Sequence, residues 1–239
     1  MDESERWSRM RFSILSIVLF FSSATLFGCS NTDSENVKTK GIYASFDVSA
    51  SNGAATAIAK FQVGGPTWSF LDLSSGDSIT VNGLVLTRQE LLGIIEYRKS
   101  VPYSEGGIYT FVFSREDEEP YTSTVTLTEA VTISSPTAGA NATKGQSLSV
   151  QWNAGADASD SISVSLSKQG DDETGYSSSS LVSTASSHTI PASDTLTVNG
   201  GNIPATVSVF RERDGQMAEG LDGSIQSSQY DSVDITLVD

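Results

Sequence analysis

From residue 42 onward, apolar and polar residues alternate along most of the chain. Successive side chains of a β-strand point to opposite faces, so this period of two predicts strands with one buried face. The clearest apolar positions of the first half are Ile42, Ala44, Phe46 and Val48, followed by Ala57, Ala59, Phe61 and Val63. Those of the second half are Leu148, Val150 and Trp152, then Ile162, Val164 and Leu166, then Val207 and Val209, then Val233, Ile235 and Leu237.

Turn signals separate these segments. Asn82-Gly83 lies between two apolar segments, and an Asn-Gly pair in that setting predicts a two-residue β-hairpin. Residues 108–113 are apolar almost throughout, as expected of a buried strand, and the acidic residues 115–120 predict a solvated turn before the alternation resumes at 121–128. Only residues 87–99 have the pattern of a short helix. Many short strands with turns between them predict antiparallel β-sandwiches.

A faint internal repeat predicts two modules. Residues 77–83 (DSITVNG) match residues 194–200 (DTLTVNG), and residues 111–116 are similar to residues 207–212. The spacing differs, so the first copy needs an insertion, for which residues 88–105 are the candidate. A Pro/Gly-containing turn at residues 134–139 is typical of a domain boundary. We therefore expect an all-β chain with an N-terminal sandwich at 41–130 and a C-terminal sandwich at 131–239, although one larger sandwich remains an alternative.

The start of the second half resembles the opening of immunoglobulin-like domains in bacterial surface proteins. The resemblance rests on Pro136, Gly139, Gly145 and the alternation that ends at Trp152. It implies a first strand that ends near the proline and a second strand that carries a core tryptophan. It implies a fold and no activity.

The N-terminus has the pattern of an export signal. Residues 12–27 are apolar and uncharged, and they follow Arg6, Arg9 and Arg11. Roughly 20 apolar residues are needed to span a bilayer, so this stretch is short for a permanent anchor. An ordinary cleaved signal peptide or a short membrane helix is the alternative. Met10 would also make an ordinary signal start.

This segment ends in a sequence that resembles the lipobox of bacterial lipoproteins. Leu26, Gly28 and Cys29 fit it, and Cys29 is the only cysteine in the chain. The resemblance implies cleavage of residues 1–28, attachment of diacylglycerol to Cys29 and acylation of the new amine. Ser30 after the cysteine implies sorting to the outer membrane, on its periplasmic or surface face. Residues 29–40 are polar and aperiodic, so we expect a flexible tether.

Composition excludes several function classes. The chain has 14 Lys+Arg against 29 Asp+Glu, a net charge of −15, which disfavours binding to a nucleic-acid backbone. One cysteine and one histidine exclude cysteine-rich and multi-histidine metal sites. Apart from the lipid we expect no cofactor. Asp171 and Asp172 are the least unfavourable position for a structural calcium, although no Asp-x-Asp-x-Asp-Gly loop is present.

Catalytic candidates are few. His188 lies near several hydroxyl residues and Asp194, but no Gly-x-Ser-x-Gly motif positions a serine nucleophile. We therefore predict no catalysis. A hydrolase is the weakest of three hypotheses.

Aromatic residues give the binding candidates. Trp152 shares a face with apolar neighbours and is expected in the core, whereas Trp68, Tyr97 and Tyr103 are candidates for ligand contact. The first hypothesis is a non-enzymatic, lipid-anchored envelope protein that binds another envelope protein or has a structural role. The second is a carbohydrate-binding module that stacks sugars on these aromatics.

Overall fold

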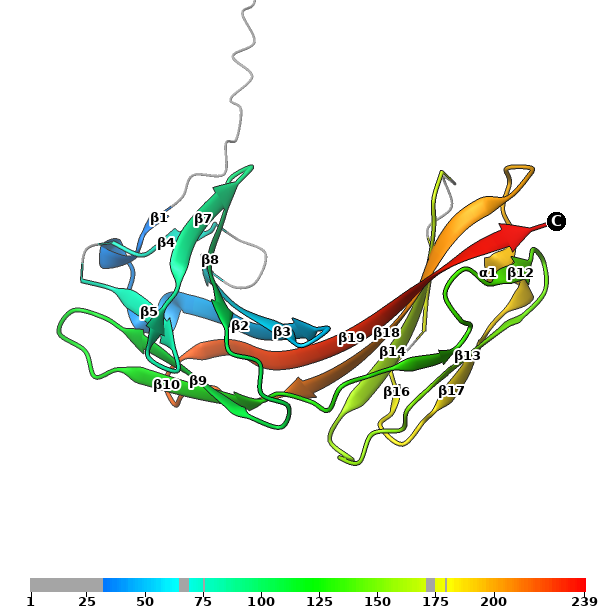
Figure 1. The fold of residues 1–239 in the computed structure, drawn as a ribbon. Coiled ribbons are helices and arrows are strands. Elements are labelled where there is room, and N and C mark those ends of the chain that lie inside the picture. Colours follow the sequence, from blue (N-terminus) through cyan, green and yellow to red (C-terminus); the bar gives the residue numbers. More distant parts are fainter. Residues whose placement is uncertain (1–31, 65–68, 75, 171–174, 179) are drawn as a thin grey trace, which may run out of the picture.

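The computed structural model describes residues 32–64, 69–74, 76–170, 175–178 and 180–239. They form two lobes built almost entirely of β-strands, joined by a long curved pair of strands (Figure 1). The expected all-β class is confirmed.

The first lobe is a sandwich of two sheets. One sheet has the order β10-β9-β5-β6, and the strands that face it come in the order β2-β3-β8-β7. Their bounds are β2 (Ile42–Ser51), β3 (Ala54–Val63), β5 (Ser78–Val81), β6 (Leu84–Val85), β7 (Thr87–Leu91), β8 (Ile94–Val101), β9 (Ile108–Ser114) and β10 (Tyr121–Thr126). The alternating apolar residues meet between the sheets, where Phe46 stacks on Phe111 at 4.9 Å and Phe61 lies 4.6 Å from Phe113.

The second lobe has the strand order of an immunoglobulin-like sandwich. A three-stranded sheet, β11-β13-β17, packs against β14, β18 and β19, which carry the short strands β15, β16 and β12 at their margins. The bounds are β11 (Ile133–Ser135), β12 (Asn141–Thr143), β13 (Leu148–Trp152), β14 (Ser161–Lys168), β15 (Tyr176–Ser177), β16 (Leu181–Val182), β17 (Ser187–Ile190), α1 (Ala192–Thr195), β18 (Ile203–Asp214) and β19 (Asp222–Val238). Trp152 is 3% exposed in this core, as expected.

The hairpin of β18 and β19 belongs to both lobes. Residues 222–229 of β19 pair with β2 in parallel, and residues 236–238 pair with β12. Leu221 and Ile225 therefore pack in the core of the first lobe, although they lie beyond the expected boundary at residue 131. One ten-stranded sheet runs through the molecule, and the facing sheets of both lobes lie on the same side of it (Figure 1).

Polar side chains replace apolar ones where β19 crosses between the cores. Ser227 donates to the Thr126 carbonyl at 2.8 Å, and Gln229 donates to the Thr128 carbonyl. Asp231 accepts from the backbone N–H of Ile133 at 2.8 Å. These bonds hold the end of β10 and the linker, which we define as residues 127–132 between β10 and β11. The linker forms no strand at the crossing, so side chains supply partners for its buried peptide groups.

Arg211 on β18 completes this arrangement, and we call these contacts the junction clasp. Its side chain is 0% exposed and donates to the carbonyls of Glu129 and Ala130, each at 3.2 Å, and of Asn153 at 2.8 Å. Burial lowers the pKa of Arg211, while the nearby carboxylates act in the opposite direction. Gly155 packs directly against it, since an added Cβ would lie 3.1 Å from Nε.

Two local predictions are wrong. Residues 87–99 form the β7–β8 hairpin instead of a helix, because Leu92 and Gly93 make a tight turn and Ile95 and Tyr97 bury on one face with the period of a strand. The repeat at 194–200 forms the end of α1 and a loop, unlike the hairpin at 77–83. The Asn82-Gly83 hairpin is confirmed, with φ of 47° and 79°.

The segment expected as a flexible tether is ordered over residues 32–40. It forms β1 (Thr32–Asp33) and the 3₁₀ turns η1 (Ser34–Asn36) and η2 (Thr39–Gly41). Arg115 donates to the carbonyls of Ser34 and Val37 and to the Thr39 hydroxyl. β1 also pairs with β4 (Leu71–Asp72). Long-range partners therefore give this polar segment a structure that its own pattern does not indicate.

We expect Arg211→Met to lower the free energy of unfolding by about 3 kcal/mol, because the part-buried carbonyls of Glu129, Ala130 and Asn153 all lose a charged donor. Urea denaturation measures this. Arg88→Ala, which removes an exposed ion pair with Asp72, is the matched control and should cost less than about 1 kcal/mol. A similar small cost for both variants would contradict the role of the clasp.

The side of the shared sheet that faces away from both cores, here called the outer face, holds a perturbed carboxyl group. Asp47 lies between Gln226 and Ile58 in the sheet. Burial raises its pKa to about 6, and the charge of Glu212 acts in the same direction, while Gln226 and Lys60 oppose it.

This carboxyl predicts a pH-dependent stability. Between about pH 4 and pH 6 the folded state binds more protons than the unfolded state, so the free energy of unfolding should fall as the pH rises. Asp47→Asn should remove this fall and stabilise the protein at pH 7.5 by about 2 kcal/mol, as urea denaturation across this range would show. Asp234→Asn on the same face should keep the fall. Persistence of the full fall in Asp47→Asn would refute the assignment.

Candidate functional site

A small hollow lies where the two lobes meet. It has a volume of about 210 Å³. The hollow, called here the junction hollow, is lined by Asn52 and Gly53 of the β2–β3 turn, Tyr103, residues 130–132 of the linker, and Gln229, Tyr230 and Asp231 of β19. It forms beside β19 between the residues that pair with β2 and those that pair with β12.

Two tyrosines give this hollow its chemistry. Tyr230 is 38% exposed and stacks on Phe210 of β18 at 5.5 Å, so its ring is held by a neighbour on the outer face. The Tyr103 hydroxyl lies 3.3 Å from both Gln229 Oε1 and Glu105 Oε2, to which it donates. Burial raises the pKa of Tyr103, so this hydroxyl remains a neutral donor.

The polar groups of the hollow are already engaged in the fold. Gln229 joins Tyr103 to the linker because its amide N–H₂ donates to Thr128 while its oxygen accepts from Tyr103. Asp231 accepts from Ile133 and Ser232 through its two oxygens. Tyrosine rings with nearby amide and carboxylate groups suit a ligand that has an apolar face and hydroxyl edges.

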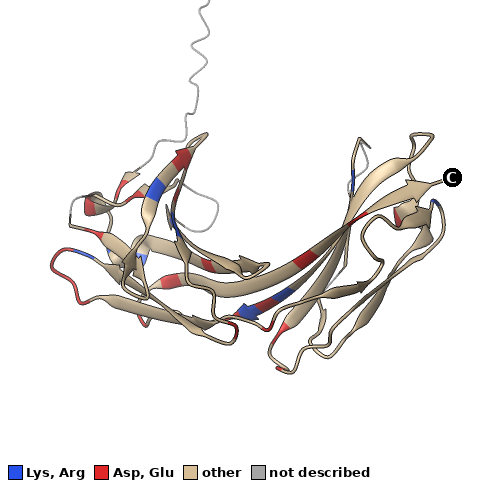
Figure 2. Cartoon of the chain, in the orientation of Figure 1, with Lys and Arg blue, Asp and Glu red and all other residues tan. Residues whose placement is uncertain are grey.

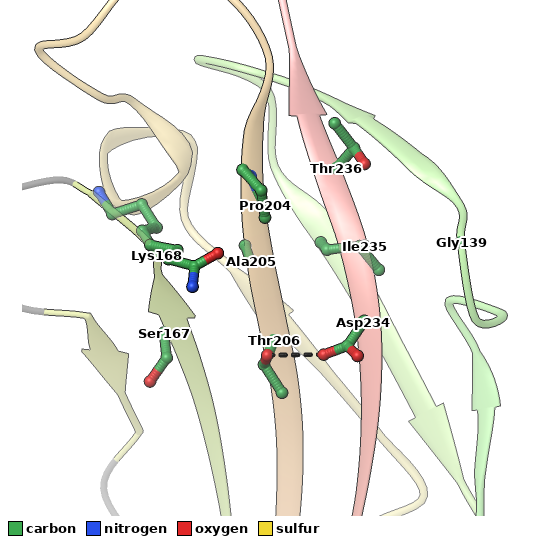
Figure 3. Close-up of a pocket in the computed structure, with 10 residues that line it drawn as sticks. Gly139, Ser167, Lys168, Pro204, Ala205, Thr206, Asp234, Ile235 and Thr236 are labelled. Atoms are coloured by element: carbon green, nitrogen blue, oxygen red, sulfur yellow. Dashed lines mark hydrogen bonds between the residues drawn. The ribbon is translucent and has the colours of Figure 1, made fainter.

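A second depression lies on the outer face of the second lobe (Figure 3). It has a volume of about 600 Å³, and its lining includes Ser167, Lys168, Thr206, Asp234 and Thr236. Thr206 and Asp234 point toward each other across neighbouring strands, with Thr206 Oγ1 donating to Asp234 Oδ1 at 2.8 Å (Figure 3). The lining has no aromatic ring, so this groove has less of the chemistry of a selective site than the junction hollow.

The two predicted ligand-contact residues that the structure describes, Tyr97 and Tyr103, are not brought together. Tyr103 lines the junction hollow, but Tyr97 is only 6% exposed in the first core. The Tyr97 hydroxyl donates to Asp72 at 2.9 Å and accepts from the Leu73 N–H at 2.7 Å, so its ring offers no exposed face for stacking. Trp68 lies outside the described residues, as do Leu26, Gly28, Cys29, Asp171 and Asp172.

His188 has a phenol as its partner. Its Nε2 lies 2.6 Å from the Tyr176 hydroxyl, and the two rings stack at 5.9 Å. Within the described ranges no group of three or more His, Cys, Asp or Glu side chains is placed to hold a metal ion. The helices of the described part are all too short or too polar to cross a membrane.

Tyr230, Phe210 and Gln229 were not among the predicted site residues. A signal for them exists in the sequence. Along the buried face of β19 the apolar alternation breaks at Ser227, Gln229 and Asp231 and resumes at Val233. Such a break in the middle of a long strand marks the crossing between two cores, where Tyr230 occupies the opposite face.

No family model and no curated protein matches this chain. Among solved structures, it is similar to the fibronectin(III)-like modules of Clostridium thermocellum CbhA, with 13% identity over 80% of this chain and 88% of that chain, and a TM-score of 0.26. At this TM-score the likeness supports no argument of its own. The all-β sandwich fold rests on the strand order described above.

Proposed function

We propose that this chain is a lipid-anchored protein of the bacterial cell envelope that acts without catalysis, as an interaction or structural module. The observation that carries the proposal is the shared β18–β19 hairpin. It makes one continuous body of two sandwiches and places an aromatic hollow at their junction. Such a body presents a fixed surface to a partner. In a sandwich scaffold, the interstrand loops and strand edges are the parts that would contact that partner.

The lipid anchor is supported by the sequence before residue 32. Cys29 follows Leu26 and Gly28 after an apolar segment, and it is the sole cysteine. Acyl chains on this cysteine would hold the protein at the membrane, with Ser30 directing it to the outer membrane. The partner in this proposal is the membrane together with an envelope protein or a glycan, and the excess of acidic residues disfavours nucleic acid (Figure 2).

We expect Cys29→Ser to abolish lipid attachment and cleavage before residue 29, so the variant should keep residues 1–28 and lack the mass of the lipid. The test is expression of the full chain in a bacterial host, followed by detergent phase partitioning and intact mass measurement. The wild-type protein should start at Cys29 and carry the mass of the attached lipid. Ser30→Ala, a neighbouring hydroxyl change, should keep the lipid. A wild-type protein that carries no lipid mass would overturn the anchor.

Glycan binding is the second candidate function, and the presence of both Tyr103 and Tyr230 in the lining of one hollow favours it. Sugar rings stack on tyrosine through their apolar face, and the oxygens of Asp231, which each accept one hydrogen bond within the fold, could each accept another from a sugar hydroxyl. Trp68 remains a predicted contact in this alternative.

We expect Tyr230→Ala to weaken binding of a glycan ligand at least tenfold, about 1.4 kcal/mol, because the stacking face is lost. Titration calorimetry with a panel of envelope polysaccharide fragments and other glycans provides the measurement. Tyr43→Ala is the control, since Tyr43 lies on β2 outside the hollow. Binding that is equal in both variants, or that no fragment produces, would rule out this hollow as a glycan site.

A further inference from the structure

Three hairpin turns of the first lobe share one backbone conformation. Each has two residues with positive φ: Asn52-Gly53 at 50° and 74°, Asn82-Gly83 at 47° and 79°, and Leu92-Gly93 at 52° and 80°. Asparagine and glycine tolerate this left-handed region, whereas leucine is disfavoured there. The β7–β8 turn therefore has a residue that its backbone does not favour.

The side chains at this turn are also unusually exposed. Leu91 is 74% exposed, Leu92 93% and Ile94 45%. Residues 91–95, which follow Glu90 around the turn, include no charged residue. The turn projects away from the body of the first lobe (Figures 1 and 2). We call Leu91, Leu92 and Ile94 the apolar tip. Single exposed apolar residues are ordinary, but three at one projecting turn indicate a surface that contacts something apolar.

The apolar tip belongs to the same side of the lobe as the start of the described chain (Figure 1). On β7, Arg88 donates through Nε to Asp72 of β4 at 2.8 Å, and β4 pairs with β1 through Thr32 and Leu71. The tip extends four residues beyond Arg88, about 13 Å along a strand. Thr32 follows Cys29 by only three residues, which span at most about 11 Å.

We propose that the apolar tip inserts into the interfacial region of the lipid bilayer to which Cys29 is attached. This inference rests on the proposed lipid anchor, and it adds a second membrane contact that orients the protein. Because residues 32–40 pack on the first lobe, an acylated Cys29 would hold that lobe close to the bilayer and not at the end of a long tether. A leucine in the turn is then explained by contact with lipid, since the fold alone would favour asparagine.

The test places a fluorescent reporter at the tip. The full chain with Leu92→Cys is purified in detergent, labelled with an environment-sensitive thiol-reactive dye and reconstituted into phosphatidylcholine–phosphatidylglycerol vesicles. We expect a blue-shifted emission, and severalfold quenching by a nitroxide carried on the lipid acyl chains. Asn52→Cys is the control, because that turn has the same backbone and lies at the junction hollow. Equal emission and quenching at the two positions would overturn the inference and direct attention to a protein partner.

A second comparison distinguishes the absence of a lipid anchor from the absence of insertion at the apolar tip. Acylation blocks the Cys29 thiol, so the wild-type chain should take up no dye, and labelling of wild type would overturn the anchor itself. Leu92→Cys and Asn52→Cys are therefore also compared in a Cys29→Ser background with the same vesicles. If residue 92 is quenched more than residue 52 in the Cys29→Ser background, the apolar tip inserts into the bilayer even without the lipid. If residue 92 is not preferentially quenched in either background, insertion of the apolar tip is refuted.

Leu92→Asn tests whether the leucine serves the fold. Asparagine suits the turn, so the thermal unfolding midpoint should stay the same or rise. A fall of more than about 5 °C would show that Leu92 stabilises the folded protein and would overturn the explanation of the strained turn.

Discussion

The crossing of β18 and β19 between two hydrophobic cores is the constraint on which the rest of the structure depends. A strand that leaves one sandwich and enters another passes a region where no second sheet covers its inner face. The linker backbone lies there instead, and its peptide groups would be buried without partners. Arg211, Ser227 and Gln229 supply the missing donors, and Asp231 supplies an acceptor.

The junction hollow follows from the same crossing. β2 pairs with β19 only as far as Gln229, and the next partner on that edge, β12, begins to pair at Thr236. Between these points the edge of β19 faces the linker and the β2–β3 turn, which leave a space beside Tyr230. The feature that joins the lobes therefore also creates the best candidate site, and a ligand there would contact residues of both lobes.

Local patterns predicted much of this fold but not its connections. The period of two identified the strands that begin at Ile42 and at Leu148, and Asn82-Gly83 identified a hairpin. The β7–β8 hairpin was missed because its residues also fit a helical pattern, and only pairing with β3 selects the strand. The parallel pairing of residues 222–229 with residues 43–50 joins segments that are far apart in the chain, so no local pattern encodes it.

The candidate site was predicted less well than the fold. Tyr103 was selected because it is aromatic and lies in a segment without a counterpart in the other half, and it does line the hollow. Tyr97 was selected on the same grounds, yet the sheet turns it inward to Asp72. Tyr230 was not predicted because the residues around it are polar on both faces of the strand. That pattern is recognised as a crossing between two cores only when the positions of both cores are known.

Polar side chains at the crossing also fix the register of the lobes. A strand with only apolar inner residues would pack nearly as well after a slip of two positions, because every second residue would still be buried. A slip in one direction would place Ile225 against the Thr126 carbonyl, which would lose its donor. A slip in the other direction would place the Asp231 carboxylate against the Thr128 carbonyl and Val233 against the Ile133 N–H. A lost hydrogen bond or two facing acceptors cost more than a poorly packed methyl group. The junction clasp thus determines where on β19 the lobes meet. It thereby sets the position of the junction hollow relative to the β7–β8 hairpin. In a protein held at the membrane by its first lobe, this position determines the direction in which the hollow faces.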